Sequence, residues 1–288
     1  MESLGFWPVM LSLIGLVVGL RVLAGWLWRA LGYSPQVVGW LGRVPGPSRL
    51  WAAVRAGFPR LSDWIVRRVE PHRFPGLPLT LMLLLSIYLL MLGGGLLEDL
   101  FEDEELTALD EDFNSALALI RDPRVLLVFG WITGLGGTET LVAISLVTIG
   151  FLWAHGRTMF IPGLLLSIAG SQCVTWAGKF LIARERPEFL TFAEAYSPSF
   201  PSAHATGAMA VYGFIAYAIG RDLSRMDRRF ELWFWSSTLI LLVAASRMIL
   251  SVHYASDVAA GLLVGGFWLI AGFALTEYLR HRDRAPAG

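Results

Sequence analysis

The chain has 288 residues; 55% of them are hydrophobic and 16% are charged, and 23 basic side chains balance 23 acidic ones. The charged fraction is well below the roughly 25% of ordinary soluble domains, so the composition argues against a soluble enzyme and favours a protein that crosses a membrane several times. A net charge of zero provides no whole-molecule attraction to nucleic acid, and a single cysteine, Cys173, excludes an intrachain disulfide.

A helix that spans the hydrocarbon layer needs about 20 mainly apolar residues. Seven segments meet or approach this length: Phe6–Leu27, Gly76–Leu97, Thr138–Ala154, Met159–Gly178, Ala205–Gly220, Leu232–Leu250 and Ser256–Tyr278. Helices are expected because lipid cannot satisfy an exposed backbone and because the alternation of a barrel strand is missing. The third and fifth segments are short, so at least one should extend into its flanking residues. The sequence predicts an all-α membrane protein.

The chain divides near residue 75. Residues 76–288 contain six of the predicted helices and form one domain, whereas residues 1–75 are an N-terminal addition with one transmembrane helix and an arginine-rich segment. Within that segment, Arg49–Val69 places apolar residues at near-helical spacing among arginines, a pattern typical of an amphipathic helix on an anionic membrane surface. A solvated cytoplasmic loop fits this segment equally well.

The basic residues set the expected orientation. Arginines gather between the first and second predicted helices, between the fifth and sixth, and after the last. Because basic connections stay in the cytoplasm, the N-terminus is expected outside and the C-terminus inside a bacterial plasma membrane. The acidic stretch Glu98–Asp112 then faces outward, where we expect a solvated charged loop rather than a cation site.

Three polar clusters interrupt the apolar sequence. They are Lys179 with Arg184, Arg186 and Pro187; Pro201-Ser202-Ala203-His204; and Ser246-Arg247 with His253 and Asp257. Counting helices from an outside N-terminus places all three clusters at helix ends on the outer, periplasmic face. Ionisable residues at the membrane edge are energetically costly, so a cluster of them usually marks a functional site. Any one of them alone would also fit a snorkelling side chain or a helix cap.

The residue types suit a phosphoryl group. Lys179, Arg186 and Arg247 provide fixed positive charge, and arginine holds two phosphate oxygens with a matched fork. Ser202 and the first amides of the following helix add donors. The carboxylates of a metal cage are missing, so no metal and no cofactor are expected. Phosphoryl transfer needs mainly positioning and charge stabilisation, which this set supplies.

The histidines suit the remaining roles. His253 and Asp257 are four residues apart, so on a helical turn they would be able to face each other. The carboxylate would keep one ring nitrogen protonated and leave the other free to attack phosphorus. His204 could protonate the leaving oxygen and later activate water.

The three clusters resemble the three signatures of the type 2 phosphatidic acid phosphatase superfamily. Lys179 with Arg186-Pro187 resembles the first, Pro201-Ser202-Ala203-His204 the second, and Ser246-Arg247 with His253 and Asp257 the third. The resemblance implies a six-helix membrane core with a metal-independent active site at its outer face. It also implies His253 as nucleophile, Asp257 as its partner and His204 as acid, with phosphate bound by Lys179, Arg186, Ser202, Arg247 and the amide of Ala203.

One position departs from the family pattern. Ala203 replaces a usual glycine, and its methyl group resists a positive φ, so a left-handed backbone there would impair phosphate binding. The expected function is hydrolysis of a phosphatidate-like lipid or of undecaprenyl diphosphate, with the lipid phosphate and membrane lipids as partners. The alternatives are a catalytically weak relative that binds lipid phosphates and a transporter of anions or lipids; the placement of the polar clusters on one face disfavours the transporter. The sequence indicates no oligomeric state.

Overall fold

The computed structural model describes residues 5–32, 56–60, 62, 63, 68, 76–102, 104–187 and 197–284, and this part of the chain contains helices and no strand. The elements are α1 (Phe6–Gly32), α5 (Leu77–Glu102), α6 (Glu104–Leu117), η1 (Ala118–Ile120), α7 (Pro123–Gly134), α8 (Thr138–Ala154), η2 (Thr158–Phe160), α9 (Ile161–Ile182), α10 (Ala203–Gly220), α11 (Met226–Ile249) and α12 (Ala255–Arg284). The predicted all-α fold is confirmed. Most of the arginine-rich segment Arg49–Val69 lies outside the described residues, and the domain boundary at residue 75 stays a prediction.

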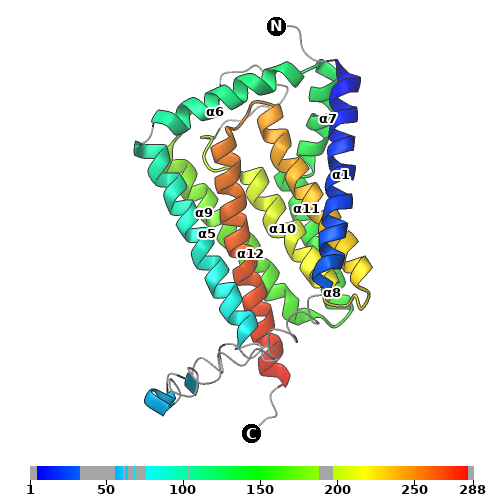
Figure 1. Ribbon diagram of the computed structural model, residues 1–288, viewed down its shortest axis with the longest axis vertical. Helices are drawn as coiled ribbons and strands as arrows, with labels where there is room; N and C mark the ends of the chain where they lie inside the picture. The colour runs from blue at the N-terminus through cyan, green and yellow to red at the C-terminus, as the bar shows by residue number, and fades with distance from the viewer. Residues whose placement is uncertain are drawn as a thin grey trace.

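The long helices run side by side along the molecule, and the start of α1 and the end of α12 lie at opposite ends of the bundle (Figure 1). Helix α10 is at the centre of the bundle and packs against α9, α11 and α12, while α1 packs from outside against α7 and α11. Helix α6 lies across the end of the bundle where α11 joins α12. This end also carries the polar clusters described below.

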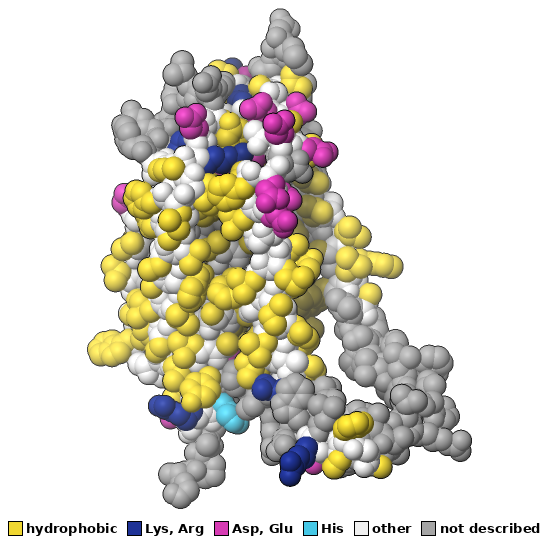
Figure 2. All heavy atoms as spheres, turned by 90° about the vertical axis from the view of Figure 1, so that its left-hand side faces the viewer, with side chains coloured by type: hydrophobic (Ala, Val, Ile, Leu, Met, Phe, Trp, Pro, Cys, Tyr) yellow, Lys and Arg dark blue, Asp and Glu magenta, His cyan; other side chains and the backbone are white. Residues whose placement is uncertain are grey.

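Six described stretches are long and apolar enough to cross a membrane: Phe6–Ala30, Leu77–Glu102, Pro123–Ala154, Thr158–Ile182, Met226–Ile249 and Ala255–Asp283. The remaining predicted span corresponds to α10, which is mostly buried among the other helices. An apolar band covers the face in Figure 2; acidic side chains gather mainly at the α6 end, and basic side chains lie at both ends. The chain is therefore an integral membrane protein.

The third predicted span is extended on its N-terminal side. Helix α7 precedes α8, and the chain bends at residues 135–137 between them. Asp122 is the N-cap of α7: its Oδ1 accepts a hydrogen bond of 2.8 Å from the backbone N–H of Arg124. At the bend, a Cβ on Gly136 would lie 2.4 Å from Val243 Cγ1, so glycine lets the bend approach α11 closely.

Small residues allow α12 to lie directly against α9 and α10. A Cβ on Gly261 would lie 2.6 Å from the carbonyl oxygen of Ser202, and one on Gly265 would lie 2.8 Å from that of Thr206. On α9, a Cβ on Gly170 would enter the ring of Trp268. Lipid provides no hydrophobic drive for helices to associate, so such close backbone packing holds a membrane bundle together.

The packing argument predicts opposite effects for one substitution at two glycines. A Cβ on Gly163 of α9 would lie 2.1 Å from Thr276 Oγ1 and 2.5 Å from the carbonyl oxygen of Gly272, whereas Gly150 of α8 has open space. Gly163→Ala should destabilise the fold by about 1–3 kcal/mol through overpacking. Gly150→Ala should stabilise it by about 0.5–1 kcal/mol, because alanine loses less backbone entropy in a helix. Apparent unfolding temperatures in detergent measure both; equal shifts would contradict the close contact of α9 and α12.

Candidate active site

The three polar clusters meet around one cavity of about 540 Å³. Its polar end is lined by residues from all three clusters: Lys179, Arg186, Ala203, His204, Arg247 and His253. These residues come from the C-terminal part of α9 and the connection after it, the start of α10, the end of α11 and the turn before α12. The bundle therefore joins residues that are up to about 75 positions apart in the sequence.

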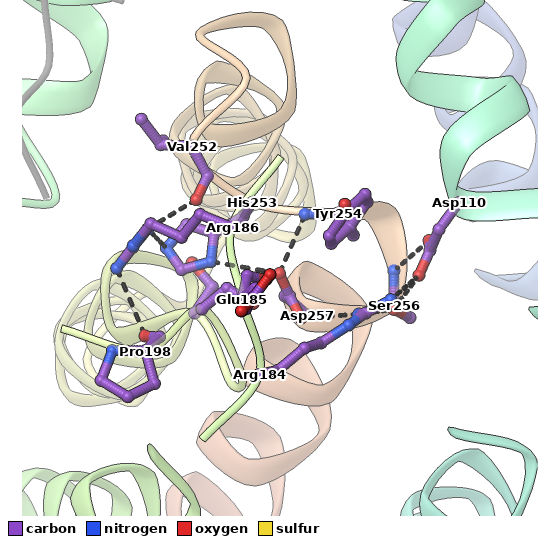
Figure 3. A network of polar contacts seen from close by, with 12 residues as sticks. Asp110, Arg184, Glu185, Arg186, Pro198, Val252, His253, Tyr254, Ser256 and Asp257 are labelled. Atoms are coloured by element: carbon purple, nitrogen blue, oxygen red, sulfur yellow. Dashed lines mark hydrogen bonds and ion pairs between the residues drawn. The ribbon is translucent and has the colours of Figure 1, made fainter. Parts of the chain in front are cut away.

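His253 lies in the turn between α11 and α12, and Asp257 lies behind it in the first turn of α12 (Figure 3). His253 Nδ1 is 3.4 Å from Asp257 Oδ2, and the two side chains are 2% and 0% exposed. At this distance the Asp257 carboxylate faces Nδ1, but the contact lacks the geometry of a hydrogen bond. The backbone N–H of Tyr254 donates to the same oxygen, Asp257 Oδ2, at 2.9 Å and fixes the carboxylate in the turn.

The other ring nitrogen of His253 faces a donor. Arg186 Nη1 is 3.3 Å from His253 Nε2, and a guanidinium group only donates, so Nε2 is the acceptor and carries no proton. Burial lowers the pKa of His253 to about 4, and the nearby Asp257 only partly opposes this effect. The imidazole is therefore neutral at neutral pH, and the lone pair on Nε2 points toward Arg186.

The cationic side chains line the cavity and also bind the loop above it. Lys179 Nζ donates to the carbonyl oxygen of Pro198 at 2.5 Å. Arg186 donates through Nε to the carbonyl oxygen of Ser197 at 2.8 Å and through Nη1 to that of Val252 at 2.5 Å. These contacts fix residues 197–199 and the turn before His253 against each other.

Arg247 projects from the last turn of α11 and is 4% exposed. Its Nη1 donates to Thr133 Oγ1 of α7 at 2.6 Å, which anchors one arm of the guanidinium group. Its Nε is buried without a hydrogen-bond partner. Thr133 was not singled out from the sequence, since nothing in the apolar helix around it indicates a polar contact.

The second cluster forms the N-terminus of α10. Ser202 precedes the helix, and its backbone N–H donates to the carbonyl oxygen of Asp257 at 3.0 Å. The Ser202 side chain is fully buried behind the cavity and is not among its lining residues. Ala203 begins the helix and does line the cavity. Among described non-glycine residues, a positive φ occurs at Ala183 and Ser251, so the backbone at residue 203 does not require glycine.

Unpaired polar atoms concentrate at this site. Among the described residues, four buried side-chain atoms have no hydrogen-bond partner, and three of them are Ser202 Oγ, Arg247 Nε and His253 Nδ1. An unpaired buried polar group costs about 1–3 kcal/mol, so native proteins keep such groups mainly where function needs them. Of these three atoms, Arg247 Nε belongs to a cationic residue that lines the cavity, and it fits a polar, anionic ligand.

The cavity continues from its polar end as an apolar groove between α8 and α9. Its walls include Leu141, Val142, Leu146 and Ile149 of α8 and Leu165, Ile168 and Trp176 of α9. Leu165 precedes Lys179 by fourteen residues, a distance of about 21 Å along a helix. The groove thus runs through about two-thirds of a hydrocarbon layer of about 30 Å.

Sequence reasoning missed the role of Asp110. The stretch Glu98–Asp112 was expected to be a solvated loop, but its described residues belong to α5 and α6, and Asp110 is 3% exposed. Arg184 Nη2 donates to Asp110 Oδ2 at 2.8 Å, and the backbone N–H of Ser256 donates to Oδ1 at 3.1 Å (Figure 3). The expectation was wrong at this residue because the fold supplies these partners. The available signal was spacing: Leu106, Asp110, Asn114 and Leu117 follow the inward face of α6.

The chain is similar to several known proteins. Residues 161–281 match the family described as the PAP2 superfamily. Phosphatidylglycerophosphatase B of Bacillus subtilis (strain 168) is 30% identical over 167 residues, which cover 57% of this chain and 82% of that protein. The crystal structure of a transmembrane PAP2 type phosphatidylglycerolphosphate phosphatase from Bacillus subtilis is 26% identical with a TM-score of 0.60, covering 65% of this chain and 94% of that one. The structure of Aquifex aeolicus LpxE is 20% identical with a TM-score of 0.46, covering 58% and 93%.

The matched region contains all three polar clusters and the four helices that carry them. It leaves out α1 and the helices from α5 to α8. The chain therefore belongs to the PAP2 superfamily and is an integral-membrane phosphatase.

Proposed function

We propose that the chain is a lipid phosphate phosphatase that works through a phosphohistidine on His253. The observation that carries this proposal is a single cavity with a cationic end, a neutral imidazole in that end, and an apolar groove leading away from it. The cationic end matches a phosphate group, and the groove matches a hydrocarbon tail. The names of the related phosphatases, which act on a lipid phosphate, support the same substrate class.

In the first step, His253 Nε2 attacks phosphorus and the bond from phosphorus to the leaving oxygen breaks. Lys179, Arg186 and Arg247 offset the negative charge on the transferring phosphoryl group. The backbone N–H of Ala203, at the N-terminus of α10, donates a hydrogen bond to one of its oxygens. Asp257 stabilises the positive charge that develops on the imidazole. His204, which also lines the cavity, donates a proton to the leaving oxygen.

In the second step, His204 takes a proton from a water molecule as that water attacks phosphorus. The bond between phosphorus and Nε2 breaks, and inorganic phosphate is released. Ser202 supports this geometry from behind the cavity wall, because its N–H binds the carbonyl oxygen of Asp257 and its hydroxyl lies at the start of α10.

The substrate is proposed to be a phosphatidate-like lipid phosphate, with phosphatidylglycerophosphate, phosphatidate and undecaprenyl diphosphate as the compounds to test. An acyl or isoprenoid chain would occupy the groove between α8 and α9. The active site is proposed to face the outside, with the C-terminus in the cytoplasm, because the arginines that follow α10 and those at the end of α12 lie at the end of the bundle opposite the acidic α6.

The main test is phosphate release by the purified protein in detergent with EDTA present, using these three lipids. The wild-type protein should release phosphate from at least one of them, because its charge stabilisation comes from arginine and lysine. His253→Ala should lose turnover completely while keeping the unfolding temperature and elution volume of a folded protein. A wild-type protein that releases no phosphate, or a His253→Ala variant that keeps its rate, would contradict the proposal.

Turnover should depend on the two-armed guanidinium group of Arg247. Arg247→Lys keeps the charge but cannot bind Thr133 and a phosphate oxygen together. We expect kcat/KM to fall about 10²–10³-fold, the range for loss of one donor that stabilises a transition state. Arg225→Lys, an exposed change in the connection between α10 and α11, is the matched control and should leave the rate unchanged. A rate loss below threefold for Arg247→Lys would remove Arg247 from the phosphate site.

The neutral state of His253 predicts how stability depends on pH. Its pKa is about 4 in the folded protein, against about 6.5 in an unfolded chain. Between these values the unfolded state binds the additional proton, so acidification through this window lowers stability by about 1.4 kcal/mol per pH unit. The unfolding temperature of the wild type should fall more between pH 7 and pH 5 than that of His253→Gln. The exposed change His281→Gln should behave like the wild type, and identical slopes for all three proteins would contradict a buried neutral His253.

A further inference from the structure

Arg184 lies between two buried carboxylates. It follows α9 and precedes Arg186 by two residues. Its Nη1 donates to Asp257 Oδ1 at 2.9 Å, and its Nη2 donates to Asp110 Oδ2 at 2.8 Å. The Arg184 side chain is 12% exposed, and those of Asp110 and Asp257 are 3% and 0% exposed. The guanidinium group thus bridges α6 and α12 by two charge-assisted contacts.

Further contacts make this bridge rigid. Arg184 Nη1 also donates to Ser256 Oγ at 2.7 Å, and the Ser256 hydroxyl in turn donates to Asp110 Oδ2. The guanidinium carbon lies 4.3 Å from the centre of the Tyr254 ring. Tyr254 and Ser256 belong to the segment that connects His253 to Asp257, so Arg184 contacts this segment at two further residues (Figure 3).

The charges at this bridge must be compensated because they are buried. An isolated buried charge is very costly, whereas a paired and hydrogen-bonded one is tolerated. Burial acts to lower the pKa of Arg184, but Asp257 and Asp110 outweigh it and raise the pKa. Arg184 therefore stays positively charged, and each carboxylate keeps a cationic partner.

Neither Arg184 nor Asp110 lines the cavity, so neither is placed to touch a substrate. Both lead to the nucleophile through one continuous path: Asp110 binds Arg184, Arg184 binds Asp257 Oδ1, and Asp257 Oδ2 faces His253 Nδ1. A carboxylate that orients a catalytic histidine needs a fixed position of its own, because small displacements in an active site reduce the rate strongly.

We infer that Arg184 and Asp110 are a positioning pair that holds Asp257 against His253, which makes helix α6 a support of the active site. The inference rests on the proposed phosphohistidine mechanism. It assigns Asp110 a function that its place in an acidic surface helix does not suggest, and it explains why one residue of that helix is buried while its neighbours are exposed.

The charges of Arg184 and Asp110 should also affect how readily His253 and Asp257 take up a proton. The charged and titratable groups around His253 and Asp257 are Lys179 of α9, Arg184 and Arg186 after α9, His204 of α10, Arg247 of α11 and Asp110 of α6. Removing the positive charge of Arg184 makes proton uptake by His253 or Asp257 more favourable. Removing the negative charge of Asp110 has the opposite effect. The acidic limb of kcat/KM should move to higher pH in Arg184→Gln and to lower pH in Asp110→Asn.

The test compares Arg184→Gln, Arg184→Lys and Asp110→Asn with Asp112→Asn, an exposed change of the same type on the same helix. With a lipid phosphate that the wild type hydrolyses, Arg184→Gln should lower kcat about 10–100-fold, as when a hydrogen-bonded support behind a functional group is removed. KM should change less than about threefold, because the pair does not touch the phosphate. Arg184→Lys should recover part of the rate, and Asp112→Asn should match the wild type.

Two results would overturn the inference: a loss of rate in Asp112→Asn equal to that in Asp110→Asn, or variants of Arg184 and Asp110 that leave both kcat and the acidic limb unchanged. If Arg184→Gln does not fold, Arg184→Lys and Asp110→Asn provide the same comparison. Opposite shifts of the acidic limb distinguish positioning from a loss of fold, which would lower activity in both variants without such shifts.

A second measurement separates this inference from the proposed function. Protein labelled with ¹⁵N-histidine, with the His253 signals identified by their loss in His253→Ala, reports the proton on His253 Nδ1 without any turnover. The His253 signals should shift in Arg184→Gln and stay unchanged in Asp112→Asn. An inactive wild type that shows this difference would refute the phosphatase proposal and retain the positioning role. An active wild type whose His253 signals match those of Arg184→Gln and Asp112→Asn would refute the positioning role and retain the phosphatase proposal.

Discussion

The contact between His253 and Asp257 is the interaction on which the rest of the site depends. A buried imidazole can attack phosphorus when one nitrogen is held in its protonated state and the other is free, and a buried carboxylate is the group that achieves this. The surrounding structure serves this contact. The N–H groups of Tyr254 and Ser202 bind the side chain and the backbone carbonyl of Asp257. Gly261 then lets α12 approach the backbone at Ser202, so the start of α10 and the start of α12 form one unit.

The second constraint is that a lipid phosphate has a charged head and an apolar tail. A membrane protein must keep buried charges compensated while it leaves an apolar path for the tail. In this fold the two requirements are separated along the bundle axis. Arginines and Lys179 gather where the helices end, and the groove between α8 and α9 runs inward from that point. Because one cavity contains both, a lipid could place its phosphate next to His253 while its tail remains in an apolar environment.

Much of the fold and the site could be predicted from the sequence, for identifiable reasons. Runs of apolar residues determine where helices cross a membrane, so helices appear at the seven expected positions. The expected site residues lie together because the motifs stand at helix ends and the number of crossings places those ends on one face. The family pattern has glycine where this chain has Ala203, which raised the question of a left-handed backbone at that position. Ala203 begins helix α10 and has no positive φ, so the backbone there accepts alanine.

Other features could not be predicted because they depend on tertiary partners. The burial of Asp110 follows from Arg184 and Ser256, which are about 74 and 146 residues away and leave no local pattern. The bend between α7 and α8 depends on contact of Gly136 with Val243, and the contact of Arg247 with Thr133 joins two helices of ordinary apolar sequence. The position of Ser202 behind the cavity rather than on its wall is likewise decided by the packing of α12.

The central claim is a covalent bond between phosphorus and His253, and trapping that bond tests it most directly. Rapid quenching of the active protein during turnover should trap the intermediate before water attacks it, without removing His204, which serves in both steps. After brief exposure to a lipid substrate labelled in its phosphate and quenching at alkaline pH, peptide mass spectrometry should find an acid-labile phosphoryl group on His253. Label on another residue, or label that persists when His253 is replaced by alanine, would contradict the account.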